Sequence, residues 1–356
     1  MTTGLLSPGV LRADFVYESA PFPSCHASTI VQTTRGSLLT AFFGGTHERH
    51  PDVCIYLSRL NDETTAAQSA APGCVLAQWS APMEVADGIQ KDGSRFPTWN
   101  PVLFQPKDGP LMLFFKVGPK PSEWWGEVKT SDDDGKTWSA ATRLPDGILG
   151  PIKNKPIQLD AAGGRAGDIL SPSSIESATQ GWRIYFERSA DNGKSWTASP
   201  LVSQSPEIKA IQPSILVHSQ TKLQAIGRTR SKRLFETWSN DAGKTWSELK
   251  LTDLPNCNSG TDAVTLADGR HLLVYNDSAT EKVRFPLNVA ISRDGRHWEM
   301  AAVLDSEPPG QYSYPAVIQT ADGLVHITYT WKRLRIKHVV IDPRALRSTP
   351  ISPRAS

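Results

Sequence analysis

The 356-residue chain has a nearly balanced charge, with 38 Lys and Arg residues against 36 Asp and Glu residues, which gives no global attraction to nucleic acid. No apolar run is long enough to span a membrane, and the N-terminus has no leader pattern. We therefore expect no membrane partner and a cytoplasmic chain, or a secreted or periplasmic one if a signal was removed. The four cysteines lack metal-ligand spacing, so we expect no metal or cofactor. The sequence leaves open whether any of these cysteines form a disulfide.

Short runs of β-branched and aromatic residues, separated by Gly, Pro, Asp and Asn, predict an all-β protein. One pattern, S-x-D-x-G-x-x-W, recurs about every 50 to 58 residues. Its Asp can accept hydrogen bonds from backbone N–H groups of a tight turn, and its Gly can adopt a positive φ. Its Trp is large enough to pack on a neighbouring unit. We therefore expect repeated hairpin units with turns that begin at Ser131, Ser189, Ser239 and Ser292.

In chain order, the first predicted strand covers residues 10–18 and has no partner nearby in the sequence. Six four-stranded units follow, and in the first of them a polar, Ala-rich insertion at 61–78 replaces the turn pattern. The last unit ends in a strand over 336–341, which we expect to pair with the 10–18 strand and leave no exposed edge. The six units begin near His26, Asn100, Lys155, Gln212, Ser259 and Tyr312.

The four turn patterns and the phrases at 150–156, 211–213, 312–315 and 328–331 resemble the sialidase-like superfamily of Asp-box, or BNR-repeat, proteins, and in particular its predicted-neuraminidase branch. The resemblance implies one domain over 1–356: a six-bladed β-propeller of four-stranded antiparallel blades, closed by the N-terminal strand. It also implies a hydrolase of carbohydrate metabolism, although one propeller fold hosts many activities.

Chain topology predicts where the binding site lies. In an antiparallel blade, the start of the first strand and the connection between the second and third strands lie at the same end. Around a ring axis these ends converge on one pocket, and their cationic, aromatic and amide side chains suit a carbohydrate that carries a carboxylate. The first-strand starts supply His26, Asn100, Gln212 and Tyr312, and the connections supply Arg49, Asp52, Lys116, Glu176, Arg228, Arg284 and Arg333.

The resemblance assigns roles to part of this set. Sialidases hold the substrate carboxylate with three arginines, and they use a tyrosine nucleophile, a glutamate that activates it and an aspartate acid/base. Residue by residue, Tyr312 matches the nucleophile and Asp52 the acid/base, whereas Arg228 and Arg284 match two of the arginines. Apart from His26, which we expect to be catalytic, the remaining candidates are expected to bind substrate.

The chain departs from the family pattern at two positions. Cys25, His26 and Ala27 stand where the first arginine is expected, and Gln212 stands where the glutamate is expected. A histidine offers a general acid or base near neutral pH. His26 paired with Tyr312 resembles the arrangement in propeller polysaccharide lyases of rhamnose-glucuronate type, in which an arginine-bound carboxylate acidifies C5 of a uronate.

Three functions follow from these residues. The leading hypothesis is a sialidase-like exo-glycosidase that acts on an acidic oligosaccharide or polysaccharide. The second is a uronate-directed lyase that uses His26 and Tyr312. The third is a glycan-binding propeller without catalysis, in which the two departures mark lost activity.

Overall fold

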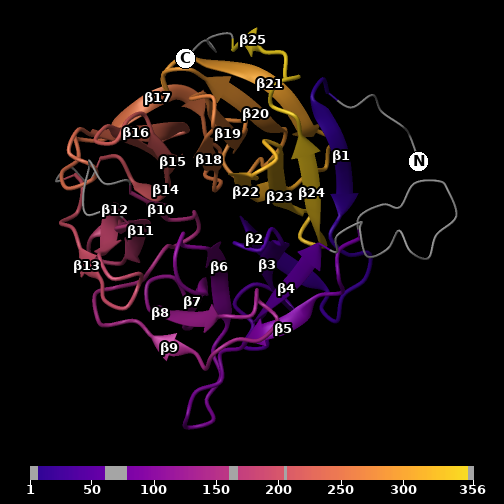
Figure 1. The fold of residues 1–356 in the computed structure, drawn as a ribbon, viewed down its shortest axis with the longest axis vertical. Helices are drawn as coiled ribbons and strands as arrows, with labels where there is room; N and C mark the ends of the chain where they lie inside the picture. The colour runs from indigo at the N-terminus through magenta and orange to yellow at the C-terminus, as the bar shows by residue number, and fades with distance from the viewer. Residues whose placement is uncertain (1–6, 61–77, 160–166, 204–206, 352–356) are drawn as a thin grey trace, which may run out of the picture.

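A computed structural model describes residues 7–60, 78–159, 167–203 and 207–351 of the chain. Its strands form six antiparallel sheets, which are arranged as blades around a central axis (Figure 1). The predicted six-bladed β-propeller is therefore confirmed. Residues 61–77, which make up nearly all of the expected insertion, lie outside the described residues.

The first three blades each contain four strands in chain order. Blade one contains β2 (Ser24–Gln32), β3 (Leu38–Gly45), β4 (Cys54–Leu60) and β5 (Met83–Ala86). Blade two contains β6 (Thr98–Phe104), β7 (Leu111–Val117), β8 (Trp125–Ser131) and β9 (Thr142–Arg143). Blade three contains β10 (Ile157–Gln158), β11 (Ile169–Ser177), β12 (Gly181–Ser189) and β13 (Thr197–Ala198).

The last three blades follow the same order with two additions at the chain ends. Blade four contains β14 (Ala210–Val217), β15 (Leu223–Thr229), β16 (Arg233–Ser239) and β17 (Lys250–Pro255). Blade five contains β18 (Asp262–Thr265), β19 (His271–Asn276), β20 (Leu287–Ser292), β21 (Trp298–Asp305) and β25 (Thr349–Pro350). Blade six contains β22 (Tyr312–Gln319), β23 (Val325–Trp331), β24 (Arg335–Ile341) and the N-terminal β1 (Val10–Phe15).

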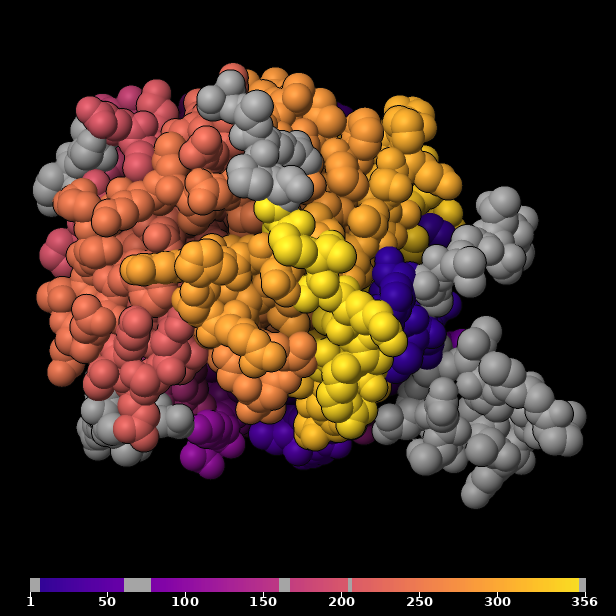
Figure 2. All heavy atoms as spheres, turned by 90° about the horizontal axis from the view of Figure 1, so that it is seen from above, coloured from indigo at the N-terminus to yellow at the C-terminus, as the bar shows by residue number. Residues whose placement is uncertain are grey.

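The ring closes where the two ends of the chain meet. β1 pairs antiparallel with β24, and the Asp342 N–H donates to the Gly9 carbonyl at 2.8 Å. Figure 2 shows the indigo N-terminal and yellow C-terminal segments side by side on the outer wall. The closing strand is thus confirmed, whereas β25, which adds a fifth strand to blade five, was not predicted.

The repeated turns have the expected hydrogen bonds. In the first of them the Asp133 carboxylate accepts from the backbone N–H groups of Lys136 and Thr137 at 3.1 and 2.8 Å. Each turn tryptophan packs on the preceding blade, as Trp246 does by stacking on Phe186 with ring centroids 4.0 Å apart. The turns therefore both close hairpins and join neighbouring blades.

A β-bulge near the start of the innermost strand recurs in four blades. In each, two residues of the inner strand oppose one residue of its neighbour. The first bulged residue has a positive φ, which costs about 1–3 kcal/mol for a residue other than glycine, and a bulge redirects the side chain at that point. These residues are Ala27, Asn100, Gln212 and Tyr314.

Cys25, Cys54 and Cys257 are buried and free, and Cys74 lies outside the described residues. Burial raises the pKa of the Cys25 and Cys54 thiols to about 12, which keeps them protonated and unreactive at neutral pH. The described ranges contain strands and turns, and they include no helix of the length and apolar character that crossing a membrane requires.

Candidate functional site

Tyr314 lies at the centre of the end where the inner strands begin. The bulge in β22 gives Tyr314 a φ of 53°. Its hydroxyl oxygen accepts a hydrogen bond from Arg228 Nη1 at 2.6 Å and lies 3.4 Å from Gln212 Nε2. Lys153 Nζ and Arg284 Cζ lie 5.8 and 5.6 Å from its ring centroid. Blades three, four and five therefore place cationic or amide groups around one phenol of blade six.

Arg228 and Arg284 come from the connections of blades four and five. Arg228 donates from Nε to Asn258 Oδ1 at 2.8 Å and from Nη1 to Gln212 Oε1 at 3.3 Å, and these hydrogen-bond partners are neutral. Burial and repulsion from Arg228 and Arg333 lower the pKa of Arg284, but an arginine stays charged in such surroundings. Arg284 Nη1 is buried and has no hydrogen-bond partner among the described residues.

Arg333 supplies a third guanidinium near these two. It follows β23 of blade six, and its carbonyl accepts from the Cys25 N–H at 2.8 Å. Its Nη1 pairs with Glu48 Oε2 at 2.7 Å. Arg333 therefore lies next to the segment of blade one in which the family resemblance implied an arginine.

His26 packs against the same phenol. Its ring centroid lies 4.1 Å from that of Tyr314, and its Nδ1 lies 3.0 Å from Thr330 Oγ1. Burial lowers the pKa of His26 well below its usual value, and repulsion from Arg333, Arg284 and other cations adds to this effect. The imidazole is consequently neutral at pH 7.

Tyr312, to which the sequence assigned the nucleophile, lies in different surroundings. Its side chain packs in the apolar cluster between blades five and six, and its hydroxyl donates to the Glu307 carbonyl at 2.9 Å. Its backbone N–H donates to the Arg284 carbonyl at 3.0 Å. The structure therefore brings Tyr314 rather than Tyr312 together with His26 and Arg228, and Tyr312 helps to hold the loop that carries Arg284.

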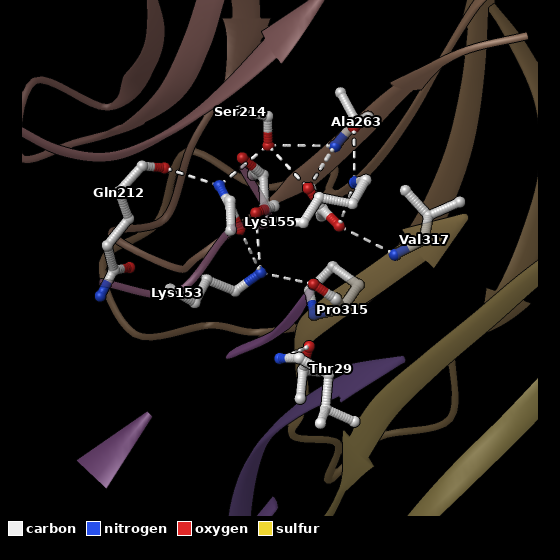
Figure 3. A network of polar contacts seen from close by, with 12 residues as sticks. Thr29, Lys153, Lys155, Gln212, Ser214, Ala263, Pro315 and Val317 are labelled. Atoms are coloured by element: carbon white, nitrogen blue, oxygen red, sulfur yellow. Dashed lines mark hydrogen bonds and ion pairs between the residues drawn. The ribbon is translucent and has the colours of Figure 1, made fainter. Parts of the chain in front are cut away.

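A buried polar network lies beside this cluster and joins blades three to six (Figure 3). Lys153 Nζ donates to the Thr261 carbonyl at 2.9 Å and to the Pro315 carbonyl, and burial lowers its pKa to about 7. Asp262 pairs with Lys155 at 2.9 Å and also accepts from the Val317 N–H at 2.9 Å. These contacts fix the chain at the Tyr314 bulge and just after it.

The two candidate acids differ in their environments. Burial raises the pKa of Glu176, which favours its protonated form, against the attraction of Arg228 and Arg230. Asp52 lies in the connection between β3 and β4, where it accepts from Thr46 Oγ1 at 2.6 Å and pairs with His50 at 2.7 Å. Hydrogen bonds from Thr46 and His50 outweigh the opposing effect of desolvation and lower the pKa of Asp52. Of the two carboxyl groups, Glu176 is therefore the one whose surroundings favour the protonated form.

The other sequence-predicted residues lie outside the cluster. Lys116 is fully buried and donates to the Pro151 carbonyl at 2.9 Å, which indicates a structural contact. Asn100 occupies the bulge position of blade two, and Arg49 is exposed in the connection after β3. The structure thus gathers His26, Gln212, Arg228, Arg284 and Arg333, and leaves Arg49, Asp52, Asn100 and Lys116 around or away from them.

The sequence did hold a signal for Tyr314. The bulge residue is followed by proline in three blades, at Asn100-Pro101, Gln212-Pro213 and Tyr314-Pro315. Alignment of these dipeptides places Tyr314, and not Tyr312, in register with Gln212. Sequence reasoning also missed Trp182, whose ring centroid lies 4.9 Å from Arg228 Cζ.

The chemical character of the site follows from these contacts. Three arginines and a buried lysine surround a tyrosine and a neutral histidine, so the centre attracts an anion. Among the described residues no group of three or more His, Cys, Asp or Glu side chains is arranged to hold a metal ion. The arrangement can bind a carboxylate and offers a phenol, an imidazole and a carboxyl group of raised pKa for proton or nucleophilic chemistry.

Curated relatives resemble parts of the chain. A sialidase of Bacteroides fragilis is 25% identical over 177 residues, which cover 46% of this chain and 31% of that protein. A sialidase of Micromonospora viridifaciens is 24% identical over 226 residues, which cover 59% of this chain and 34% of that protein. The matched segments thus span about a third of the length of these relatives.

Solved structures share the fold over nearly the whole chain. A protein of unknown function from Dyadobacter fermentans has a TM-score of 0.73 and 17% identity, covering 96% of this chain and 100% of its own. The NanB sialidase of Streptococcus pneumoniae has a TM-score of 0.71 and 12% identity, covering 94% of this chain and 71% of its own. The intramolecular trans-sialidase of Ruminococcus gnavus has a TM-score of 0.69 and 15% identity, covering 96% of this chain and 99% of its own.

The family model named BNR repeat-like domain matches residues 36–327, which is most of the chain. This match covers the inner strands of blades two to six and the four repeated turns. The chain therefore belongs to the BNR repeat-like family, whose relatives above include sialidases with the same propeller fold.

Proposed function

We propose that the chain is a sialidase-like glycosidase that binds the carboxylate of an acidic glycan with Arg228, Arg284 and Arg333. The observation that carries the proposal is the buried Arg284 Nη1, which has no partner among the described residues although it lies in a group of three arginines. A carboxylate would satisfy this donor and offset the mutual repulsion of the guanidinium groups. Sialidase relatives and structural neighbours support the assignment to glycans.

In this proposal Tyr314 takes the role that the sequence assigned to Tyr312. The hydrogen bond from Arg228 stabilises negative charge on the phenol oxygen as that oxygen approaches the anomeric carbon. Glu176 is the general acid, because burial raises its pKa and so favours the protonated form that can donate to the leaving oxygen. Asp52 stays a second candidate for this step on its family position alone.

A second candidate, β-elimination at a uronate, is favoured by one specific pair of observations. Gln212 stands where a hydrolase of the sialidase type would have its activating glutamate, and neutral His26 packs directly on Tyr314. An arginine-bound carboxylate makes C5 of a uronate more acidic, and a neutral imidazole can remove that proton. The two reactions therefore use the same carboxylate clamp, formed by Arg228, Arg284 and Arg333, and they differ in the atom that is attacked.

The test uses two substrates: an aryl sialoside, and a disaccharide in which a uronic acid carries the other sugar on O4. Hydrolysis of the aryl sialoside releases free sialic acid and the phenol, whereas elimination from the disaccharide breaks the C4–O bond and leaves an unsaturated uronate that absorbs in the ultraviolet. Arg284→Ala should lower kcat/KM about 100-fold on whichever substrate reacts, equivalent to about 2.7 kcal/mol. The control, Arg344→Ala, changes an exposed arginine that pairs with Asp342 away from the site.

Both candidate functions would be excluded by a single pattern of results. That pattern is no product from either substrate, together with equal binding of the free acidic sugars by the native chain and by the Arg284→Ala variant. Binding that Arg284→Ala abolishes, with no turnover of any acidic glycan, would instead identify the third possibility, a glycan-binding propeller.

A further inference from the structure

A cavity of about 350 Å³ opens at the same end of the propeller as the arginine cluster. Its lining comes from connections of four successive blades. Arg49 lies after β3, Lys120 after β7, Glu176 and Trp182 on the β11 and β12 hairpin, and Lys209 and Arg230 beside the inner strands of blade four. Apart from Glu176, the proposed general acid, these residues have no role in the carboxylate clamp or in the reaction proposed above.

The charge of this cavity is predominantly positive. Four of its side chains are cationic, and Glu176 is the single carboxyl among the described lining residues. Burial raises the pKa of Glu176, which reduces the negative charge that it contributes. Among the described residues Arg49 and Arg230 form no ion pair, whereas Lys120 pairs with Glu123 at 2.5 Å. The cavity therefore holds guanidinium groups that an anion can bind.

Trp182 connects this cavity to the arginine cluster. The Trp182 ring centroid lies 4.1 Å from Arg230 Cζ in the cavity and 4.9 Å from Arg228 Cζ in the clamp. The two guanidinium carbons are thus no farther apart than the sum of these distances, a span that two linked sugar residues cover. Glu176 experiences the charge of both arginines, so it lies near both groups.

We propose that this cavity binds a second anionic group, a sulfate or a carboxylate, on the sugar next to the one that is cleaved. The inference rests on the proposed function, and it narrows the substrate class to glycans with acidic groups on two adjacent residues. A planar guanidinium on an aromatic ring is pre-organised to donate two parallel hydrogen bonds to such a group. Glu176, at the junction, then faces the bond between the two sugars.

The test compares three substrates that share the same cleaved acidic sugar. In the first the neighbouring residue is neutral, in the second it carries a carboxylate, and in the third it carries a sulfate. We expect the better of the two doubly acidic substrates to have a kcat/KM about tenfold above the neutral one. This ratio should shrink as salt is added, because exposed charge interactions are screened.

Arg230→Gln and Lys209→Gln change exposed side chains, so the fold is expected to tolerate them. Each should remove most of the tenfold preference while it changes cleavage of the singly acidic substrate less than twofold. The matched control is Arg233→Gln, an exposed arginine of the same blade that pairs with Asp253 outside the cavity. It should leave all three rates unchanged.

The outcomes separate this inference from the proposed function. Equal cleavage of all three substrates, or an equal loss on all three in Arg230→Gln, would overturn the second site and leave the glycosidase proposal standing. Absence of cleavage, with weaker binding of the doubly acidic disaccharide in Arg230→Gln, would overturn the glycosidase proposal and support the second site. The preferred neighbour, carboxylate or sulfate, identifies the anion.

Discussion

Two tyrosines on one strand make the assignment of the site directly testable. Tyr314→Phe removes the oxygen that accepts from Arg228 at 2.6 Å, and it retains the ring on which His26 packs. If this oxygen is the nucleophile or acts in proton transfer, kcat should fall about 1,000-fold, equivalent to about 4 kcal/mol of transition-state stabilisation. Steady-state kinetics on the reactive substrate measure this change.

Tyr312→Phe is the matched control, because it removes a hydroxyl from the same strand. That hydroxyl donates one hydrogen bond to the Glu307 carbonyl at 2.9 Å, so its loss should cost about 1 kcal/mol of folding free energy. Thermal unfolding should show a decrease of about 2 °C in Tm, and kcat should change less than twofold.

The reasoning would be refuted by the reverse pattern. Full turnover in the Tyr314→Phe variant, or a loss of turnover in Tyr312→Phe at an unchanged KM and Tm, would remove Tyr314 from the reaction. Equal losses in both variants would mean that the shared strand, and not one phenol oxygen, limits the rate.

Three further predictions concern stability. Asp262→Asn should lower the free energy of unfolding in urea by about 3–5 kcal/mol, since it removes a buried carboxylate that pairs with the half-buried Lys155 and attracts the buried Lys153; a loss below 1 kcal/mol would contradict this. Asp133→Ala should lower Tm more than Asp132→Ala, because the Asp133 carboxylate accepts from two backbone N–H groups of the turn; equal Tm values would rule this out. Burial lowers the pKa of His271 and His326 to about 4, so the unfolded chain binds more protons below pH 6.5 and Tm should fall between pH 6.5 and 4. A smaller fall of Tm in the His326→Gln variant would show that His326 causes part of this effect. An identical fall would show that His326 makes no contribution.

Several site residues were predictable because they lie in register within the repeat. Arg228 and Arg284 end the second strands of their blades or follow them, and the topology alone places such residues at the axis. His26 and Gln212 were found in the same way at inner-strand starts. Each of these predictions depended on strand order, which the repeated turns make visible in the sequence.

Tyr312 shows where this reasoning stops. In a regular strand, Tyr312 and Tyr314 would point to the same face, because side chains alternate with a period of two. The bulge at Tyr314 breaks this alternation, and the two phenols then face different surroundings. A single extra residue in the strand therefore decided which tyrosine meets Arg228.

Arg333 and Lys153 show a second limit. Arg333 belongs to blade six, yet it lies beside Cys25 of blade one because the ring closes there. The sequence around Lys153 indicates an ordinary loop lysine, but its ammonium group donates hydrogen bonds to carbonyls of blades five and six. No local pattern reports contacts between residues that are more than 100 positions apart.

The sequence by itself determined the number of blades, the closing strand and the end of the propeller that carries the charged side chains. These features follow from turn chemistry and strand order, which act within a few residues of the chain. Only the tertiary structure decided which phenol faces the arginines, which lysines are buried and how a second cationic cavity adjoins the first. Those outcomes depend on bulges and on contacts between blades, where the direction of one side chain is set by residues far away in the sequence.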